Sequence, residues 1–556
     1  MSSQLRVVMA QVNLLVGDIA SNTRRILELT RQACEQYSAD VVVFPELALT
    51  SYPPEDLLLR PALEQRINTA LDCILQQKLP TTLVIGHPWL QQDKLYNALS
   101  VIQNGELVGR YFKQTLPNYQ VFDERRYFAT GSEPCVVSIK GVPVGFTICE
   151  DLWHAEPSRQ VADAGAALLV NINASPFSKY KLEKRCELLE RRVRETGLPI
   201  VYVNLVGGQD ELVFDGYSLV ADHTGQVHRV GTGFAEDLIP LDFACNPGQS
   251  AQLLPATELL EPVPTLEQRC YQAMVLGLRD YVQKNGFKSV ILGLSGGINS
   301  ALTLAVAVDA LGADRVSAVM MPYAYTSDLS VRLAREQAER LKVNFSIVPI
   351  ADAFDAFMGV LAPSFEGKPA DLTEQNIQAR CRGVILMALS NKTGSLVLTT
   401  GNKSEIAVGY CTLYGDMCGA FGVLKDANKM LVYALSSYRN QLAAERGESA
   451  VIPQEVIDRP PSAELAPGQR DDDNLPPYER LDQILELYVE QDQSADDIVA
   501  AGFDRNEVYR VLRLVDISEY KRRQSAPGVR LTERGFGRDR RYPITQGWKA
   551  SMQEIL

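Results

Sequence analysis

The sequence SVILGLSGGINSALTLAVAVDALG, from Ser289 to Gly312, reads as an apolar strand, a glycine-rich turn and an apolar helix. Strand and helix joined in this way form the repeating unit of a doubly wound parallel sheet, in which ligands bind where the strands end. Backbone N–H groups and the positive end of the helix dipole converge at such a turn. The turn therefore predicts a site for an anion.

The composition of the turn suits close approach to phosphate. Gly296 and Gly297 let the backbone come near a ligand and adopt positive φ, while the hydroxyls of Ser295 and Ser300 add donors. The turn lacks the GK[ST] ending of a Walker A motif and the GxGxxG pattern of a dinucleotide fold. Taken alone, SGG at a strand end is equally compatible with a purely structural turn.

Strand-like and helical segments continue to alternate beyond this turn. They include RVSAVMMP, DLSVRLAREQAERL, FSIVPI, a long helix from Asn376, and SLVLTTGN. This alternation predicts an α/β nucleotide-binding domain with a doubly wound parallel sheet. Residues 441–478 are rich in proline and charge, which predicts a mobile surface loop.

The first half is a separate layered α/β domain. It alternates strand-like runs such as RVVMAQV, VGFTICE and AALLVNIN with helical segments at Asn22–Tyr37 and Lys181–Thr196. A chain of 556 residues exceeds the size of a single core. Residues 248–265 carry three prolines without a period, as linkers do. We therefore expect domains at 1–247 and 266–556, joined by this linker.

Composition narrows the class of protein. The net charge of −13 gives no electrostatic footprint for nucleic acid, and no apolar run is long enough to cross a membrane. The opening residues MSSQLRVVMAQV lack the pattern of an export signal, so we expect a cytoplasmic protein. Ten irregularly spaced cysteines without a CxxC pair favour reduced thiols over a disulfide framework or zinc site.

Cys149 ends a strand in VGFTICEDLW, where it is a candidate nucleophile. Glu150 and Asp151 follow it and would raise the pKa of the thiol, so another group must activate it. Two other strand ends offer Glu46 and Lys113. A carboxylate can take the thiol proton and pass it to departing ammonia, and an ammonium can stabilise an oxyanion.

This glutamate, lysine and cysteine set resembles the nitrilase superfamily over residues 4–245. The variant KxxLPNYxVFDExRYF followed by CEDLW is similar to the glutaminase domain of glutamine-dependent NAD synthetases. The resemblance implies an αββα sandwich with Glu46 as general base, Lys113 as oxyanion stabiliser and Cys149 as nucleophile. It also implies three glutamine-binding residues, Tyr119, Ser175 and Lys181.

An alternative base for Cys149 is His154, five residues further along. A cysteine and histidine dyad would use it in place of Glu46. The other histidines, His87, His223 and His228, have no metal-ligand spacing.

The glycine-rich turn matches the SGGxDS pyrophosphate loop of the ATP pyrophosphatase family. Further motifs accompany it: MPYAYTSDLS, NIQARCR, LVLTTGNKSEIAVGYCTLYGD, PPSAELAPGQ, LPPY and GRDRRYP. Together they resemble the synthetase domain of NAD synthetases across residues 266–550. The resemblance implies an ATP site made by Gly293, Leu294, Ser295, Gly296, Gly297, Ile298, Asn299, Ser300 and Thr400. It implies deamido-NAD contacts at Asn376, Glu405 and Lys521, with Glu405 also a ligand of Mg²⁺.

Asn299 departs from the family pattern, which has Asp at this position. Asn offers Mg²⁺ one neutral carbonyl oxygen together with two N–H donors that the ion cannot use. The sequence therefore predicts weaker magnesium binding and slower adenylation. Tyr323 stands where the family has a small residue, which predicts a changed shape of the nucleotide pocket.

These features predict an enzyme that amidates deamido-NAD to NAD with glutamine and ATP as co-substrates, and with ammonia passed between two active sites. By resemblance to the family we expect a homo-oligomer built on a synthetase-domain dimer. One alternative is another amidotransferase of the same loop family with a different acceptor. A second is an amidase whose second half, disabled by Asn299, only senses nucleotides.

Overall fold

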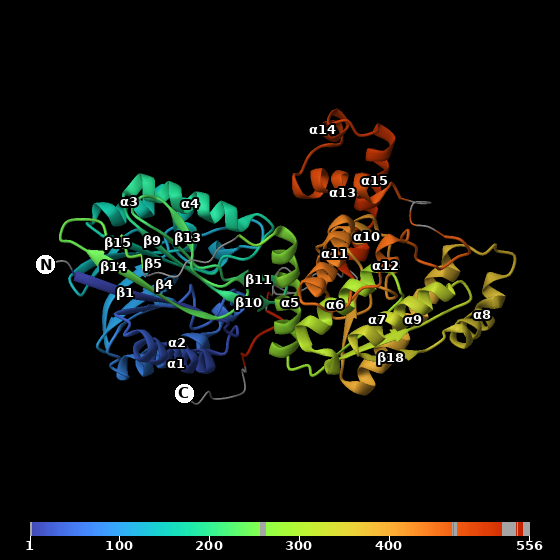
Figure 1. Ribbon diagram of the computed structural model, residues 1–556, viewed down its shortest axis with the longest axis horizontal. Coiled ribbons are helices and arrows are strands. Elements are labelled where there is room, and N and C mark those ends of the chain that lie inside the picture. Colours follow the sequence, from blue (N-terminus) through green and yellow to red (C-terminus); the bar gives the residue numbers. More distant parts are fainter. Residues whose placement is uncertain are drawn as a thin grey trace. The chain divides into compact units, whose positions relative to one another are not determined.

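A computed structural model describes residues 3–255, 263–469, 471, 475–524, 541 and 543–548. The chain forms two compact units, one of Met1–Pro264 with Arg530–Leu556 and one of Thr265–Val529 (Figure 1). The division at 264 falls inside the predicted linker, but the end of the chain differs from the prediction for 266–556. Arg541 and the residues around Thr545 belong to the first unit because their backbone groups hydrogen-bond to Asp56 and Gln209.

Two sheets face each other in the first unit, in the orders β15-β14-β1-β2-β3-β4-β5 and β13-β12-β9-β8-β7-β6. The strands of the first sheet are β1 Ser3–Gln11, β2 Val41–Val43, β3 Thr82–Gln91, β4 Lys94–Gln103, β5 Glu106–Phe112, β14 Asp237–Cys245 and β15 Gln252–Leu253. Those of the second are β6 Cys135–Ile139, β7 Val142–Ile148, β8 Leu168–Asn173, β9 Ile200–Asn204, β12 Leu219–Ala221 and β13 Val227–Arg229. A hairpin of β10 Val206–Gln209 and β11 Leu212–Asp215 stands apart. Because β15 pairs with β14, part of the predicted linker belongs to this unit.

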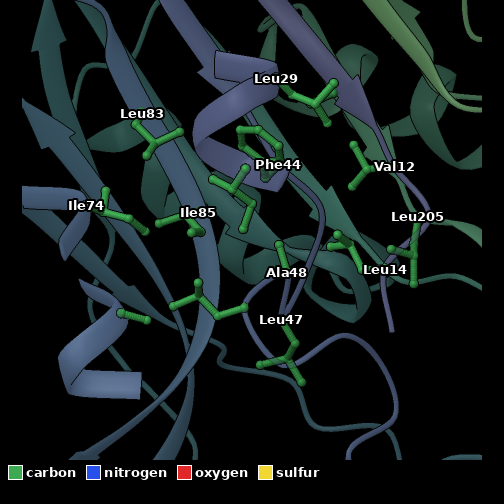
Figure 2. Close-up of a cluster of buried hydrophobic side chains, with 14 of the residues drawn as sticks. Val12, Leu14, Leu29, Phe44, Leu47, Ala48, Ile74, Leu83, Ile85 and Leu205 are labelled. Carbon is green, nitrogen blue, oxygen red and sulfur yellow. The ribbon is translucent and has the colours of Figure 1, made fainter. Parts of the chain in front are cut away.

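Alternation along the strands builds two cores in the first unit. Leu5, Val7 and Met9 of β1 point into the core between the sheets, whereas Val8 and Ala10 point to the opposite face of their sheet. That face packs on α1 Ile19–Tyr37 and α2 Pro61–Gln76 (Figure 2). The second sheet carries α3 Ala155–Asp163 and α4 Lys181–Thr196. The predicted αββα sandwich is confirmed.

The sheet of the second unit is parallel throughout, in the order β18-β17-β16-β19-β20. Its strands are β16 Val290–Gly293, β17 Val316–Met320, β18 Asn344–Ile347, β19 Leu396–Thr399 and β20 Phe421–Gly422. Strand order reverses between β16 and β19, so their connections leave in opposite directions and open a crevice at the strand ends. The predicted doubly wound sheet is confirmed, and the glycine-rich turn lies at this crevice.

Helices cover the sheet of the second unit and extend beyond it. They are α5 Leu266–Lys284, α6 Ile298–Leu311, α7 Asp328–Leu341, α8 Ala351–Phe365, α9 Leu372–Thr393, α10 Lys403–Val408, α11 Lys429–Glu445 and α12 Gln454–Asp458. A further cluster with its own apolar core contains α13 Tyr478–Leu485, the π-helix Glu486–Glu490, α14 Ala495–Ala500, α15 Arg505–Ile517 and α16 Glu519–Arg523. No helix in the described parts of the chain combines the length and apolar character needed to span a membrane.

Two local predictions for the second unit differ from the structure. The helix predicted from Asn376 begins at Leu372, because Asp371 caps it by accepting from the N–H of Thr373. The segment 441–478 is not one long loop. Its start continues α11, its middle forms α12, and the residues that follow line a cavity. Proline and charge content marked these residues as irregular but did not show that they pack on a ligand site.

Candidate active sites

Cys149 lies where β7 ends and a 3-10 helix, Cys149–Trp153, begins. Its φ is +44°, a conformation that side-chain-bearing residues seldom adopt. The side chain is buried, at 6% exposure. A sharp turn that holds a thiol at the end of a strand is typical of a nucleophile, and strain of this kind concentrates at functional sites.

Glu46 and Lys113 meet beside this thiol. Lys113 Nζ donates to Glu46 Oε1 over 2.7 Å, and both side chains are 1% exposed. Burial opposes the charge of Lys113, but the neighbouring carboxylates Glu124 and Glu46 raise its pKa well above the usual range. The charges of Glu46 and Lys113 both act on the Cys149 thiol. The structure thus brings together all three residues that the sequence predicted.

Glu124 is a fourth member of this site that the sequence analysis did not assign. Its Oε1 accepts from Lys113 Nζ over 2.8 Å and from the Tyr52 hydroxyl over 2.9 Å. Burial raises the pKa of Glu124 to about 7, although the positive charge of Lys113 acts to lower it. The residue lies inside the KxxLPNYxVFDExRYF motif, so a signal was present, but only the fold shows that it reaches the lysine.

The Cys149 thiol is protonated in this environment. Burial and the charge of Glu46 raise its pKa well above the usual range, and Lys113 only partly offsets them. A free thiolate is therefore not the resting form, and the nucleophile needs a base that acts during the attack. The expected effect of Glu150 on the thiol is present as well.

Asp151 and His154 have other roles than activating the thiol. The Asp151 carboxylate accepts from the N–H groups of Gln114 and Thr115 and so ties the turn to the chain after Lys113. The side chain of His154 is 57% exposed, and its Nε2 lies 3.8 Å from Glu150 Oε1. The histidine therefore lies near a carboxylate and is largely exposed, whereas Glu46 is buried and paired with Lys113.

Two of the predicted glutamine-binding residues, Tyr119 and Lys181, lie close enough to Cys149 and Glu150 to interact with them electrostatically. The Tyr119 hydroxyl donates to both carboxylate oxygens of Glu150, at 3.0 and 2.9 Å. Lys181, at the start of α4, lies over the ring of Trp153 with its Nζ 4.3 Å from the centroid, and burial lowers its pKa. The carboxylate of Glu150 acts in the opposite direction and raises the pKa of this ammonium. The Glu150 carboxylate and the Lys181 ammonium lie near each other, and such a pair of opposite charges suits a zwitterionic amino acid.

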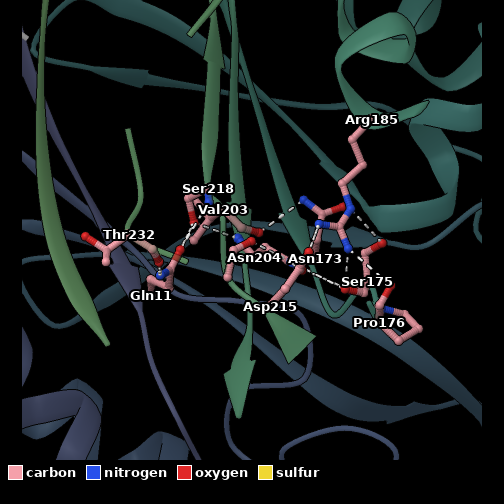
Figure 3. A network of polar contacts seen from close by, with 11 residues as sticks. Gln11, Asn173, Ser175, Pro176, Arg185, Val203, Asn204, Asp215, Ser218 and Thr232 are labelled. Carbon is pink, nitrogen blue, oxygen red and sulfur yellow. Dashed lines mark hydrogen bonds and ion pairs between the residues drawn. The ribbon is translucent and has the colours of Figure 1, made fainter. Parts of the chain in front are cut away.

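Ser175 is held in place by a buried network of polar side chains (Figure 3). Arg185, fully buried, donates from Nε to Ser175 Oγ and from Nη2 to the Ser175 carbonyl. Its Nη1 forms an ion pair with Asp215 over 2.8 Å. Asn204 accepts from the N–H of Ser175 and donates to Asp215. The network fixes the segment that follows β8, so Ser175 is placed rigidly.

The glycine-rich turn of the second unit leaves β16 and enters α6. Gly296 has φ of +77°, and a Cβ there would lie 2.4 Å from the carbonyl oxygen of Ser330. Only glycine fits this position. Ser295 Oγ and Ser300 Oγ lie 3.1 Å apart, and the N–H of Gly297 donates to Ser295 Oγ. Hydroxyl and amide donors are therefore clustered on the turn.

A cavity of about 270 Å³ opens beside this turn. Most of the residues predicted to bind ATP line it, namely Gly293, Leu294, Ser295, Gly297, Ile298, Asn299, Ser300 and Thr400. Gly296 does not, since it packs on Ser330. Arg382, Lys429 and Arg459 also line the cavity and were not singled out from the sequence. Arg382 lies in the motif NIQARCR, and Arg459 directly precedes PPSAELAPGQ. The sequence does not show in which direction such a side chain points.

Of the three residues predicted to contact deamido-NAD, one lines the cavity and two do not. Glu405 lines the cavity. Asn376 and Lys521 are absent from its wall: Asn376 Oδ1 accepts from the Thr412 hydroxyl, and Lys521 Nζ donates to the carbonyls of Gly409 and Cys411. Tyr323, expected to shape the pocket, is absent from its wall and packs on Phe354, with ring centroids 4.7 Å apart and ring planes tilted by 51°. Of the motif GRDRRYP, residues 537–540 and 542 lie outside the described residues.

Asn299 directs its amide group at Glu405. Its Nδ2 lies 2.9 Å from each carboxylate oxygen, while its Oδ1 accepts from Lys429 Nζ and Asn402 Nδ2 over 3.2 Å. Lys429 Nζ also donates to Glu405 Oε1 over 3.0 Å. Although burial opposes its charge, Glu405 raises the pKa of Lys429. Glu405 is therefore one of four carboxylates that line the cavity, with Asp416, Glu464 and Asp471, and protein donors already occupy it.

Glu405 and its neighbours could hold Mg²⁺ only together with a bound nucleotide. Mg²⁺ commonly uses one or two carboxylates together with phosphate oxygens and water. Glu405 can serve as such a ligand, but the Asn299 amide faces it with N–H groups. No cluster of three or more His, Cys, Asp or Glu side chains suited to a metal ion occurs among the residues that the structure describes. Substrate phosphates would have to supply most of the ligands.

Comparison with known proteins covers the whole chain. Residues 6–244 match the carbon-nitrogen hydrolase family, and residues 270–525 match the NAD synthase family. The glutamine-dependent NAD(+) synthetase of Xanthomonas campestris pv. campestris is 50% identical, over 98% of each chain. That of Thermotoga maritima is 42% identical, over 98% of this chain and 99% of its own. The solved structure of glutamine-dependent NAD+ synthetase from Acinetobacter baumannii, in complex with ADP, superposes with a TM-score of 0.84 at 45% identity, covering 99% and 100% of the two chains.

Proposed function

The chain belongs to the glutamine-dependent NAD(+) synthetases, and we propose how its two units divide the amidation of deamido-NAD to NAD. The first unit frees ammonia from glutamine, and the second uses it to amidate deamido-NAD at the expense of ATP. The products are NAD, glutamate, AMP and pyrophosphate. The observation that carries this division is the Lys113–Glu46 pair buried beside the Cys149 thiol.

In the first unit Cys149 attacks the carboxamide carbon of glutamine while Glu46 takes the thiol proton. Lys113 stabilises the oxyanion that forms, and ammonia leaves with the proton that Glu46 returns. Glu46 then activates water, which releases glutamate from the thioester. Tyr119, Ser175 and Lys181 bind the amino acid end of glutamine.

In the second unit the turn Gly293–Ser300 and Thr400 hold ATP, and Asn376, Glu405 and Lys521 contact deamido-NAD. The nicotinate carboxylate attacks the α-phosphate and displaces pyrophosphate, and ammonia then displaces AMP from the adenylate. Support for the ATP residues comes from the cavity that they line. When bound with ATP, Mg²⁺ would neutralise charge on the leaving pyrophosphate, with Glu405 as its protein ligand.

Asn299 weakens the magnesium site in this proposal. Its N–H groups lie 2.9 Å from both oxygens of Glu405, in the place where an Asp would add a second negative ligand. Adenylation is expected to be slower than it would be with Asp at this position. Lys429, which donates to Asn299 and Glu405, supplies a resident positive charge at the same point.

Ammonia reaches the second site by a shielded route in this proposal. Near neutral pH most free ammonia is protonated and loses the lone pair that attacks the adenylate. A route closed to bulk water prevents this loss. A mixing experiment tests it: labelled ammonium added beside unlabelled glutamine should enter NAD only slightly, and equal entry of both nitrogens would contradict shielding.

A homo-oligomer built on the second unit is the remaining part of the proposal. Helix α8 is apolar, yet only Phe354 of its residues is buried. Phe357 and Val360 of α8 and Val384 of α9 are exposed by 49%, 77% and 62%. Monomers seldom leave such a patch open, which supports contact with a second copy. Light scattering on the chain and on Val360→Ser tests this, and a monomeric wild-type chain would contradict it.

A product assay tests the central proposal. ATP, glutamine and deamido-NAD should give AMP, pyrophosphate, glutamate and NAD in equal amounts. Cys149→Ala should abolish NAD formation from glutamine and preserve it from ammonium. Loss of both activities in a folded variant would contradict the division between the units.

The two alternatives predict different products. An amidase with a nucleotide-sensing second half would release glutamate and ammonia without AMP or NAD. An amidotransferase with another acceptor would leave deamido-NAD unchanged. Identity of 50% over 98% of a glutamine-dependent NAD(+) synthetase favours deamido-NAD as the acceptor.

A further inference from the structure

The two carboxylate oxygens of Glu46 have unequal numbers of donors. Oε1 accepts from Lys113 Nζ and from Asn97 Nδ2, each over 2.7 Å. Oε2 accepts from the backbone N–H of Ala174 over 3.0 Å, and the described residues offer it no other donor. A carboxylate oxygen has two acceptor positions. Both acceptor positions of Oε1 are therefore filled, whereas one acceptor position of Oε2 is open.

Asn97 is held rigidly in the position from which it reaches Glu46. It lies on β4, is fully buried, and its carbonyl oxygen accepts from the N–H of Lys113. The side chains of Asn97 and Lys113 therefore reach Glu46 from neighbouring positions of one ladder. β4 pairs antiparallel with β3 and with β5, and the register irregularity between Val101 and Ile102 lies away from Asn97, so neither backbone can shift alone at this point.

The orientation of the Asn97 amide follows from its acceptor. Oδ1 is buried, and no donor for it exists among the described residues. A flipped amide would satisfy neither group, since Oδ1 would then face the negative Oε1 of Glu46. The N–H donation to Glu46 is therefore the interaction that fixes this side chain, and its other end is left unpaired, which costs stability.

We propose that Asn97 is a positioning residue that fills Oε1 of Glu46 and thereby reserves Oε2 for the proton of Cys149. This inference rests on the proposed role of Glu46 as general base. The S–H bond of Cys149 breaks, its proton goes to Oε2, and the sulfur forms a bond with the carboxamide carbon of glutamine. The same proton then passes from Oε2 to the departing nitrogen as the C–N bond breaks.

Four titratable groups face Glu46 from different elements: Lys113 after β5, Glu124 in the 3-10 helix Glu124–Arg126, Cys149 after β7, and Tyr52. Lys113 Nζ donates to Glu124 Oε1 as well as to Glu46 Oε1, so it is divided between two carboxylates. Asn97 is uncharged and cannot exchange a proton at ordinary pH. It can favour the carboxylate form of Glu46 without repelling Lys113.

The test is the pH–rate profile of glutamine hydrolysis by Asn97→Leu in the full-length protein. We expect kcat to fall by about 10- to 100-fold, within the usual range for general-base catalysis, with little change in KM. The acid limb should move to higher pH, because the carboxylate loses a donor to its charged form. NAD formation from ammonium should be unchanged, because it uses the second unit, and a cooperative urea unfolding transition reports that the first unit folds.

Asn97→Asp is the second variant, since it keeps the shape and replaces the N–H donor by an oxygen. It should show the same loss and the same direction of the acid limb. Asn171→Leu is the matched control. Asn171 is likewise fully buried, donates once from Nδ2, to Thr147 Oγ1, and has an unpaired Oδ1. Its loss should lower stability without moving the acid limb.

An unchanged acid limb in both Asn97 variants would overturn the inference, even if kcat fell, because a purely structural role does not alter the titration. Failure of the proposed function is a separate result: Cys149→Ala would then still hydrolyse glutamine. If Cys149→Ala is inactive on glutamine and the Asn97 variants keep the wild-type profile, only the inference on Asn97 fails.

Discussion

The site around Cys149 and the cavity around Asn299 differ in what the protein itself has already supplied. In the first, Glu46 and Lys113 are 1% exposed and form a buried ion pair. In the second, the carboxylate of Glu405 is occupied by the Asn299 amide and Lys429. Thiol chemistry needs only groups that the chain carries, so its site is built in advance. Phosphate chemistry needs charges that arrive with the nucleotide, so its site stays open and lined by donors.

The largest effect is expected when the prebuilt ion pair is broken. Lys113→Met removes the oxyanion donor and leaves Glu46 and Glu124 as unpaired carboxylates in a buried site. Glutamine hydrolysis should fall by about 1000-fold, the scale of a lost oxyanion donor. The rate of glutamate release measures this. NAD formation from ammonium is the control, and its loss in parallel would show that the two sites are not independently built.

The next effect concerns pH and the same buried cluster. Burial raises the pKa of Glu124 to about 7 from its ordinary value of 4.5. A carboxyl group whose pKa rises on folding binds a proton more tightly in the folded state than in the unfolded state. Its contribution to stability is therefore present below pH 4.5 and is lost as pH rises through about 7. From pH 5 to 7 the wild-type free energy of unfolding should fall by about 2 kcal/mol more than that of Glu124→Gln. Urea titrations of both proteins measure the difference, and parallel curves would contradict it.

A smaller gain is expected where the second site is incomplete. Asn299→Asp replaces two N–H donors by an anionic oxygen, so Mg²⁺ should bind more tightly and adenylation should rise by about tenfold at limiting magnesium. Pyrophosphate release at a series of magnesium concentrations measures this. Glutamine hydrolysis without deamido-NAD should stay the same. Equal magnesium dependence of the two proteins would contradict a role for residue 299 in magnesium binding.

The smallest effect is expected at the rim of the first site. Lys181→Met removes an ammonium that is partly open and lies over Trp153. The KM for glutamine should rise about fivefold, on the scale of a partly screened ion pair, with kcat nearly unchanged. Initial rates over a range of glutamine concentrations separate the two constants. A large fall in kcat would mean that Lys181 takes part in the chemistry.

Some parts of both sites could be read from the sequence because local pattern and position decide them. The strand, the glycine turn and the helix are adjacent in sequence, and Ser295 and Asn299 of this segment line the cavity. The helix Lys181–Thr196 was predicted at its observed bounds. Asn97 carried no such signal, since a buried asparagine on a strand has many uses.

The chain by itself determined the strand, turn and helix order of both units, the candidate nucleophile and the departure at Asn299, because these depend on residues adjacent in sequence. Only the tertiary structure decided which polar groups meet: Glu124 and Asn97 with the Lys113–Glu46 pair, and Lys429 with Glu405. Hydrogen bonds act over about 3 Å, so they depend on how distant strands pair and pack. That packing joins side chains 11 to 67 positions apart and leaves no periodic trace in the sequence.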